Sequence, residues 1–97
     1  MSAITERVQR GAAFLDETRP GWWRVIDLGL LDIASPCRCT LGQLGAWDGI
    51  GATLAIACGF LSYCAAVGEH PTAEYAELTA AWRELTEKRR TVAGLMA

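Results

Sequence analysis

The chain has 97 residues and a net charge of −2 at pH 7, and 52% of its residues are hydrophobic. This length suits one hydrophobic core and not two, so we predict a single domain over residues 1–97. The four tryptophans exclude a disordered chain, because each can bury on the order of 200 Å². Nucleic-acid binding is not expected, since it depends on a basic face.

The first ten residues, MSAITERVQR, contain an acid and two arginines where a signal peptide needs an apolar core. We therefore expect a cytoplasmic protein. In that compartment thiols are normally reduced, so structural disulfides are not expected.

Residues 3–18 are predicted to form an amphipathic helix that Ser2 caps through its hydroxyl. Its apolar face has the spacing of an α-helix and comprises Ile4, Val8, Gly11, Ala12 and Leu15. The pair Arg19-Pro20 should end this helix, because a residue before proline avoids the helical region.

A tryptophan pair and a nearly palindromic run, IDLGLLDI, follow over residues 22–34. Folded about Gly29-Leu30, this run would form a short β-hairpin with a two-residue turn. That register would place Asp27 opposite Asp32, and like charges in facing positions are unfavourable. The sequence leaves two alternatives here, an irregular segment or a short hairpin.

The pair Ser35-Pro36 predicts a helix start, with serine as the N-cap and proline at the first helical position. The inner stripe expected for this helix is Cys37, Thr40, Leu44, Trp47, Gly51 and Leu54. Glycines at 42, 45, 49 and 51 weaken a helix, so we expect a break between Gly49 and Gly51.

Residues 49–68 carry no charge, and twenty uncharged residues are about the span of a bilayer. However, the run contains several glycines, and acidic residues flank it on both sides. We therefore favour a buried central helix that bends at Gly59-Phe60 over a membrane-spanning one.

The clearest helical pattern covers residues 71–93 and is expected to stop at Gly94. Its predicted inner stripe is Tyr75, Leu78, Trp82, Leu85, Thr86, Arg89 and Ala93. An arginine on this stripe should pair with Asp16, Asp27 or Asp32, or extend its head to water. Together these segments predict a mainly α protein, a small single-domain bundle of three to four helices.

Several blocks in order resemble a known family: GAAFLDETRPGWWRVIDLGLLDIASPCRCTLGQLG, then ACGF, then YAELTAAWRELTEKRR. The family consists of small uncharacterised proteins that are common in phages and prophages of actinobacteria. The resemblance covers roughly residues 10–90. It implies a phage origin but no activity, and relatives tend to be more polar where this chain has the uncharged residues 50–57.

The cysteines allow a second interpretation, a metal-binding or redox-sensing protein. The candidate ligands are Cys37, Cys39, Cys58, Cys64 and His70. Their C-x-C and C-x5-C spacings do not fit the usual structural zinc pairs, so no metal or other cofactor is expected. A thiol pair at 37 and 39 in the first turn of a helix could be reactive, but Cys37 as a small apolar core residue is favoured.

No nucleophile, phosphate-loop or paired-carboxylate motif is present in the sequence, so no catalytic residues are predicted and an enzyme is not expected. We instead expect a non-enzymatic protein–protein interaction module that acts on a host or phage protein, with a symmetric homodimer as a further expectation. Tryptophan and arginine dominate interface hot spots, so the candidate contacts are Trp22, Trp23, Trp82 and Arg83. Core packing is the favoured role of Trp47 and Trp82, and one ring of the adjacent pair should be buried.

Overall fold

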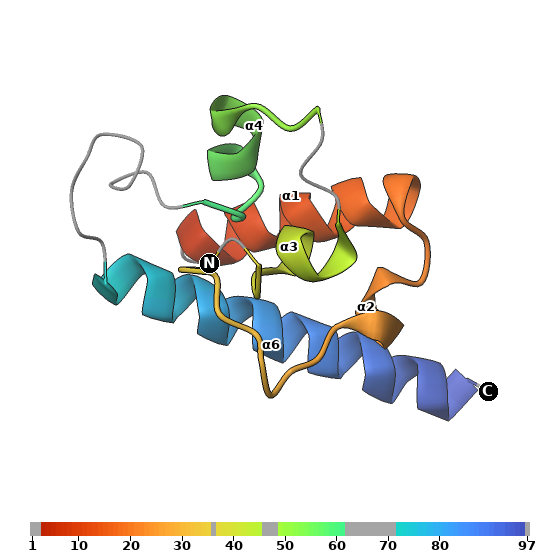
Figure 1. Ribbon diagram of the computed structural model, residues 1–97. Coiled ribbons are helices and arrows are strands. Elements are labelled where there is room, and N and C mark those ends of the chain that lie inside the picture. The colour runs from red at the N-terminus through yellow and green to blue at the C-terminus, as the bar shows by residue number, and fades with distance from the viewer. Residues whose placement is uncertain (1–2, 36, 46–48, 62–71, 97) are drawn as a thin grey trace.

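The computed structural model describes residues 3–35, 37–45, 49–61 and 72–96. Within these ranges the chain forms five helices and no strand, so it is mainly α as predicted. Figure 1 shows the two long helices, α1 and α6, side by side, with the three short helices around them. The helices are α1 (Ala3–Thr18), α2 (Trp22–Val25), α3 (Thr40–Leu44), α4 (Ala52–Ala57) and α6 (Thr72–Met96).

Helix α1 has the predicted bounds, and its apolar face is the predicted one. Val8, Gly11, Ala12 and Leu15 are buried, and Ile4 is half-buried. The proposed cap Ser2 lies outside the described residues.

Helix α2 is a single turn that begins after Gly21, whose φ of 78° is left-handed. The following residues 26–33, here called the strap, contain no strand and run beside α6. Asp27 makes the turn itself: its carbonyl accepts from the Leu30 amide at 3.2 Å and its side chain from the Gly29 amide at 2.9 Å. Of the two alternatives for residues 22–34, the irregular one is observed over residues 26–34, after the single helical turn of α2.

Polar contacts hold the strap against α6. The Ile33 amide donates to the Thr79 hydroxyl at 3.0 Å, and the Arg83 guanidinium donates to the Leu28 carbonyl at 3.1 Å. Ile33 is also buried, so apolar and polar contacts fix the same segment.

The helix predicted from Ser35 does not begin there. Ser35 starts one isolated turn, and α3 begins only after Cys39, whose sulfur accepts from the Gly42 amide at 3.3 Å. The helix ends at Gly45, which has a φ of 64°. The break expected near Gly49, where φ is 81°, is present, but the helix has already ended earlier.

The break predicted between Gly49 and Gly51 separates α3 from α4, which begins after Gly51. Five helices are described where three to four were expected, because residues 22–25 form the single turn α2. Two members of the predicted inner stripe lie at the surface: Cys37 is exposed, and Leu54 is 39% exposed. Gly45 and Gly49 have positive φ angles, which favour a turn over a continuous helix, and this explains why α3 ends at Gly45.

The uncharged segment 49–68 is helical only over α4 in its described part, residues 49–61. Gly59, with a φ of 73°, turns the chain where the bend was predicted, and Phe60 is buried after it. Among the helices that the structure describes, none has the length and apolar character needed to cross a membrane.

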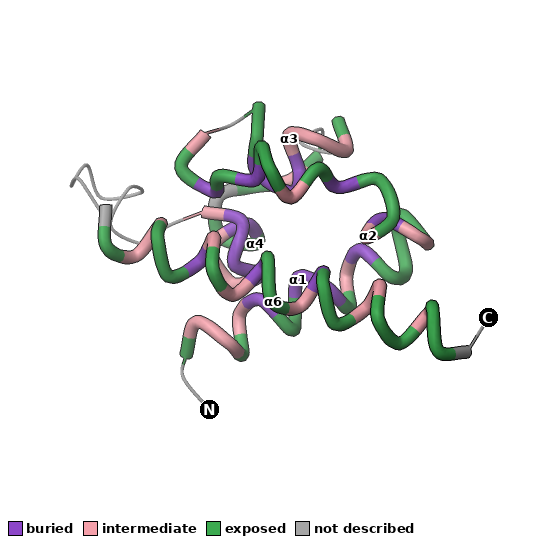
Figure 2. The backbone as a smooth tube through the Cα atoms, turned by 90° about the horizontal axis from the view of Figure 1, so that it is seen from below, coloured by how far each residue is buried: buried purple, intermediate pink, exposed green. Residues whose placement is uncertain are grey.

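Helix α6 buries the predicted stripe most deeply at Leu78, Trp82 and Thr86. It continues past Gly94 to Met96, so the predicted stop is wrong. A glycine ends a helix by adopting a left-handed conformation, and Gly94 does not have a positive φ. Figure 2 shows buried positions on every helix and along the strap, with a group of them where α1, α4 and α6 face one another.

The core is built around the Trp82 ring. Phe60 stacks on it at a centroid distance of 5.2 Å, and Trp22 meets it edge-on at 5.6 Å. Its indole N–H donates to the Gly59 carbonyl at 2.7 Å, which satisfies the one polar atom of a fully buried side chain. Trp82 thus joins α6 to α2 and to the turn after α4.

Gly11 makes this packing possible. A Cβ atom at this position would lie 2.1 Å from the Cys58 carbonyl oxygen and 2.7 Å from Cζ2 of Trp82. Only a residue without a side chain allows α1 to approach both groups.

We expect Gly11→Ala to lower the free energy of unfolding by roughly 1–3 kcal/mol, as overpacking of a core does. The matched control is Gly94→Ala, where an added Cβ meets nothing within 4 Å. The control should be neutral or stabilising by up to about 1 kcal/mol, because alanine favours helix. Urea unfolding of both variants measures the difference, and equal stabilities would contradict the packing described.

Candidate protein-binding surface

The structure separates the four predicted contact residues. Trp22 and Trp82 are 1% and 0% exposed, so their rings lie in the core and do not reach the surface. Trp23 is half-buried and Arg83 is exposed. The expectation that one ring of the adjacent pair is buried and the other partly exposed is confirmed.

Trp23 and Arg83 do not share a surface. The Arg83 guanidinium points to the strap, where it donates to the Leu28 carbonyl. The side chain of Trp23 lies near Leu85 and Val92, on the flank of α6 that faces α1. Of the four candidate contact residues, only Trp23 therefore lies on the flank of α6 that faces α1.

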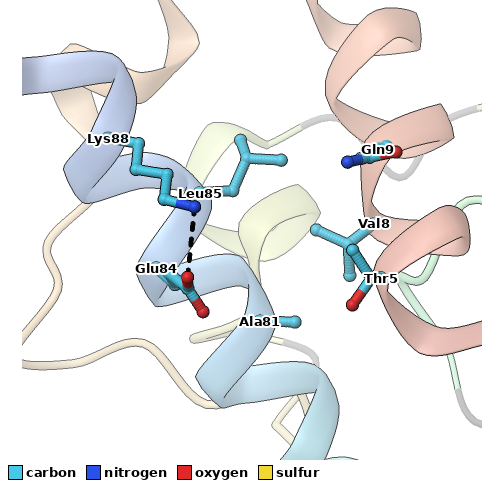
Figure 3. Close-up of a pocket in the computed structure, with 7 residues that line it drawn as sticks. All are labelled: Thr5, Val8, Gln9, Ala81, Glu84, Leu85 and Lys88. Carbon is cyan, nitrogen blue, oxygen red and sulfur yellow. Dashed lines mark ion pairs between the residues drawn. The ribbon is translucent and has the colours of Figure 1, made fainter. Parts of the chain in front are cut away.

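A groove runs between α1 and α6. Figure 3 shows its walls, with Val8 of α1 and Leu85 of α6 projecting toward the space between the helices. This part has a volume of about 170 Å³. It is lined by Thr5, Val8, Gln9, Ala81, Glu84, Leu85 and Lys88.

The groove continues toward the end of α6, because Gln9, Leu85 and Lys88 line its next part as well. We call the whole the α1–α6 surface. Besides the residues already given, it comprises Trp23, Arg89, Val92 and Ala93.

Helical spacing explains why α6 supplies this second face. Ala81, Leu85, Lys88 and Val92 are separated by four, three and four residues, so they lie on one flank beside the buried stripe. The buried stripe follows the same period through Leu78 and Trp82. Leu85, Arg89 and Ala93 belong to the predicted inner stripe, whereas in the structure they line this surface.

The charges of the surface are arranged mainly at its Trp23 end. Lys88 pairs with Glu84 at 3.2 Å, with both side chains at least 70% exposed, so this pair adds little to stability. The Arg24 guanidinium lies over the Trp23 ring, 4.8 Å from its centroid.

Asp16 connects the surface to the core. Its carboxylate accepts from Arg89 at 2.7 Å and from the indole N–H of Trp22 at 3.1 Å. Of the three partners that the sequence suggested for Arg89, the structure selects this one. The hydrogen bond from Arg89 is the main cause that lowers the pKa of Asp16 below its ordinary value, against a smaller opposing effect of burial.

The three cysteines in the described part of the chain do not gather into a metal site. Cys37 is exposed, whereas Cys39 and Cys58 are buried, and burial raises the pKa of the Cys58 thiol. Cys39 is the N-cap of α3 and Cys37 lies before it, so neither sits in the first turn of a helix as predicted. No three His, Cys, Asp or Glu residues among those described are placed to hold a metal. Cys64 and His70 lie outside the described ranges, as does Trp47.

Comparisons of the chain with protein-family models, curated proteins and solved structures give no match. The resemblance to the phage family therefore remains a prediction from the sequence.

We expect Asp16→Asn to cost about 0.5 kcal/mol at neutral pH, because its side chain is 41% exposed and the ion pair is screened by water. A carboxyl whose folded pKa is lowered stabilises the fold above its ordinary pKa, here 3.8, and this stability is lost as pH falls through the folded value. The difference between the two proteins in urea unfolding should therefore be constant at neutral pH and shrink as the pH falls below 3.8, the ordinary pKa of the group. A difference that persists at the lowest pH would contradict this role.

The tryptophan pair should respond unequally to truncation. Trp22→Ala should cost about 3–5 kcal/mol, as for other core aromatics, and Trp23→Ala roughly 1 kcal/mol. Thermal and urea unfolding of the single variants tests this, and equal losses would place Trp23 in the core. Because Trp22→Ala removes much of the stability of a small domain, only Trp23 is suitable for binding experiments.

Proposed function

We propose that this protein is a non-enzymatic protein-binding module that acts on a host or phage protein in the host cytoplasm. The observation that carries the proposal is the α1–α6 surface, where apolar side chains from three helices lie beside a groove. The phage-type blocks in the sequence support the origin of the module and of its target.

Two exposed apolar residues adjoin each other at the end of α6. Val92 is 52% exposed and Leu95, three residues further along α6, is 82% exposed. Val92 lines the same end of the groove as Trp23 and Leu85. Leu95 is placed beside Val92 by the spacing of three residues along the helix. Exposed apolar residues that adjoin one another are typical of interaction sites, because covering them removes apolar area from water.

Trp23 is positioned to serve as an anchor. Its carbonyl accepts from Nε of Arg90 at 2.9 Å, so the backbone beneath the ring is tied to α6. A large side chain on a fixed backbone loses little freedom when it is covered, and such aromatic residues dominate binding energies.

A symmetric dimer is the competing use of the same surface. We propose a different protein as the main partner, and we keep self-association as an outcome that the experiments must detect.

The test is affinity capture from lysates of phage-free and phage-infected actinobacterial cells, with the full chain as bait. The variant is Val92→Asp, and the matched control is Leu30→Asp, since both residues are 52% exposed and only Val92 lines the surface. Both variants must first show wild-type circular dichroism.

We expect a protein that wild type and Leu30→Asp retain and that Val92→Asp loses at least about tenfold, as for a central interface residue. Equal retention by both variants would exclude this surface. Retention of nothing above an unrelated bait would contradict the proposed function.

A further inference from the structure

The groove between α1 and α6 has the shape of a binding site for a helix. α1 contributes Thr5, Val8 and Gln9, spaced by three and one, and α6 contributes residues of the same kind of spacing from Ala81 onward. Such rows are the ridges that border the groove between two packed helices, and a third helix can lay its own side chains between them (Figure 3). From Ala81 to Ala93 the surface is about 18 Å long, which about 12 residues of helix would cover.

The floor of the groove calls for an apolar stripe on that helix. Leu85 lies in its middle, and Val92 and Trp23 line the far end. A helix meets such a row with apolar residues at positions i, i+3 or i+4, and i+7.

The charges at the Trp23 end of the surface determine which charge is favoured on the residues that flank the apolar stripe of that helix. Three cations lie there: Arg24, Lys88 and Arg89. Lys88 and Arg89 have one carboxylate each, from Glu84 and Asp16. Among the described residues no carboxylate pairs with Arg24.

The imbalance favours acidic residues on the occupant. The Glu84–Lys88 pair is highly exposed, so Lys88 can interact with a second carboxylate at little cost. A basic helix would bring like charges together at this end, and like charges across an interface are strongly unfavourable.

We infer that the α1–α6 surface binds an amphipathic helix of a partner protein, with its apolar stripe on Leu85, Val92 and Trp23 and acidic residues facing Arg24 and Lys88. This inference rests on the proposed function, since it specifies the chemistry of the partner.

The test uses two synthetic helical peptides of about 18 residues, or five turns. They share one apolar stripe and differ only in their flanks, which are all glutamate in one and all lysine in the other. Calorimetry with the full-length protein gives the affinities, and shifts of backbone amide resonances locate the peptide. We expect the acidic peptide to bind at least about tenfold more tightly than the basic one, and its affinity to fall as salt is added.

The charge variant is Arg24→Glu, because the Arg24 guanidinium lies over the Trp23 ring of the surface. Its matched control is Arg38→Glu, since Arg38 is also exposed but neither lines the surface nor stacks on a residue that does. Arg24→Glu should lower the affinity for the acidic peptide about tenfold and bring the affinities of the two peptides closer together. Arg38→Glu should leave both affinities unchanged.

Equal binding of the two peptides, preference for the basic one, or the same loss in both variants would overturn the inference. So would a wild-type dimer in sedimentation that Val92→Asp dissociates, because a second copy would then occupy the surface. If capture from lysate finds a partner that depends on Val92 while the peptides show no acidic preference, the inference fails and the proposed function stands.

Discussion

The packing of the Trp82 indole is the constraint on which the rest of the molecule depends. Phe60 stacks on the ring, Trp22 meets it in a T-shaped contact, and the indole N–H donates to the Gly59 carbonyl. These partners come from segments far apart in the sequence, so the ring fixes the positions of α2 and of the turn after α4 at once. The absence of a side chain at Gly11 lets α1 close against the same ring.

This core also determines what is left at the surface. Because Trp82 and its helical neighbours use one stripe of α6 for packing, the adjacent stripe with Leu85 and Val92 remains for contacts outside the chain. The end of α6 extends past the other helices in both overall views, so its apolar residues there have little of the molecule to cover them.

Arginine side chains donate to backbone carbonyls of the short helices α2 and α4 and of the irregular segments that follow them, and so hold these parts of the chain in place. Arg7 donates to the carbonyls of Ile56 and Leu61, both at 2.8 Å, and pairs with Glu74 at the start of α6. Arg90 bonds the carbonyls of Trp23 and Ile26 in the same way. Arginine suits this role because one planar group donates in several directions.

The sequence by itself determined the long helices, since the helical spacing of apolar residues over α1 and α6 depends only on local order along the chain. It also suggested Asp16 as a partner of Arg89, beside Asp27, Asp32 or an arginine head extended to water. Only the tertiary structure decided that Trp22 rather than Trp23 enters the core, that the helix expected from Ser35 is shortened to α3, and that the flank of α6 with Leu85 and Val92 lies open beside α1. Each of these depends on which distant segment packs against a residue, and the spacing of apolar residues along the chain does not determine those contacts.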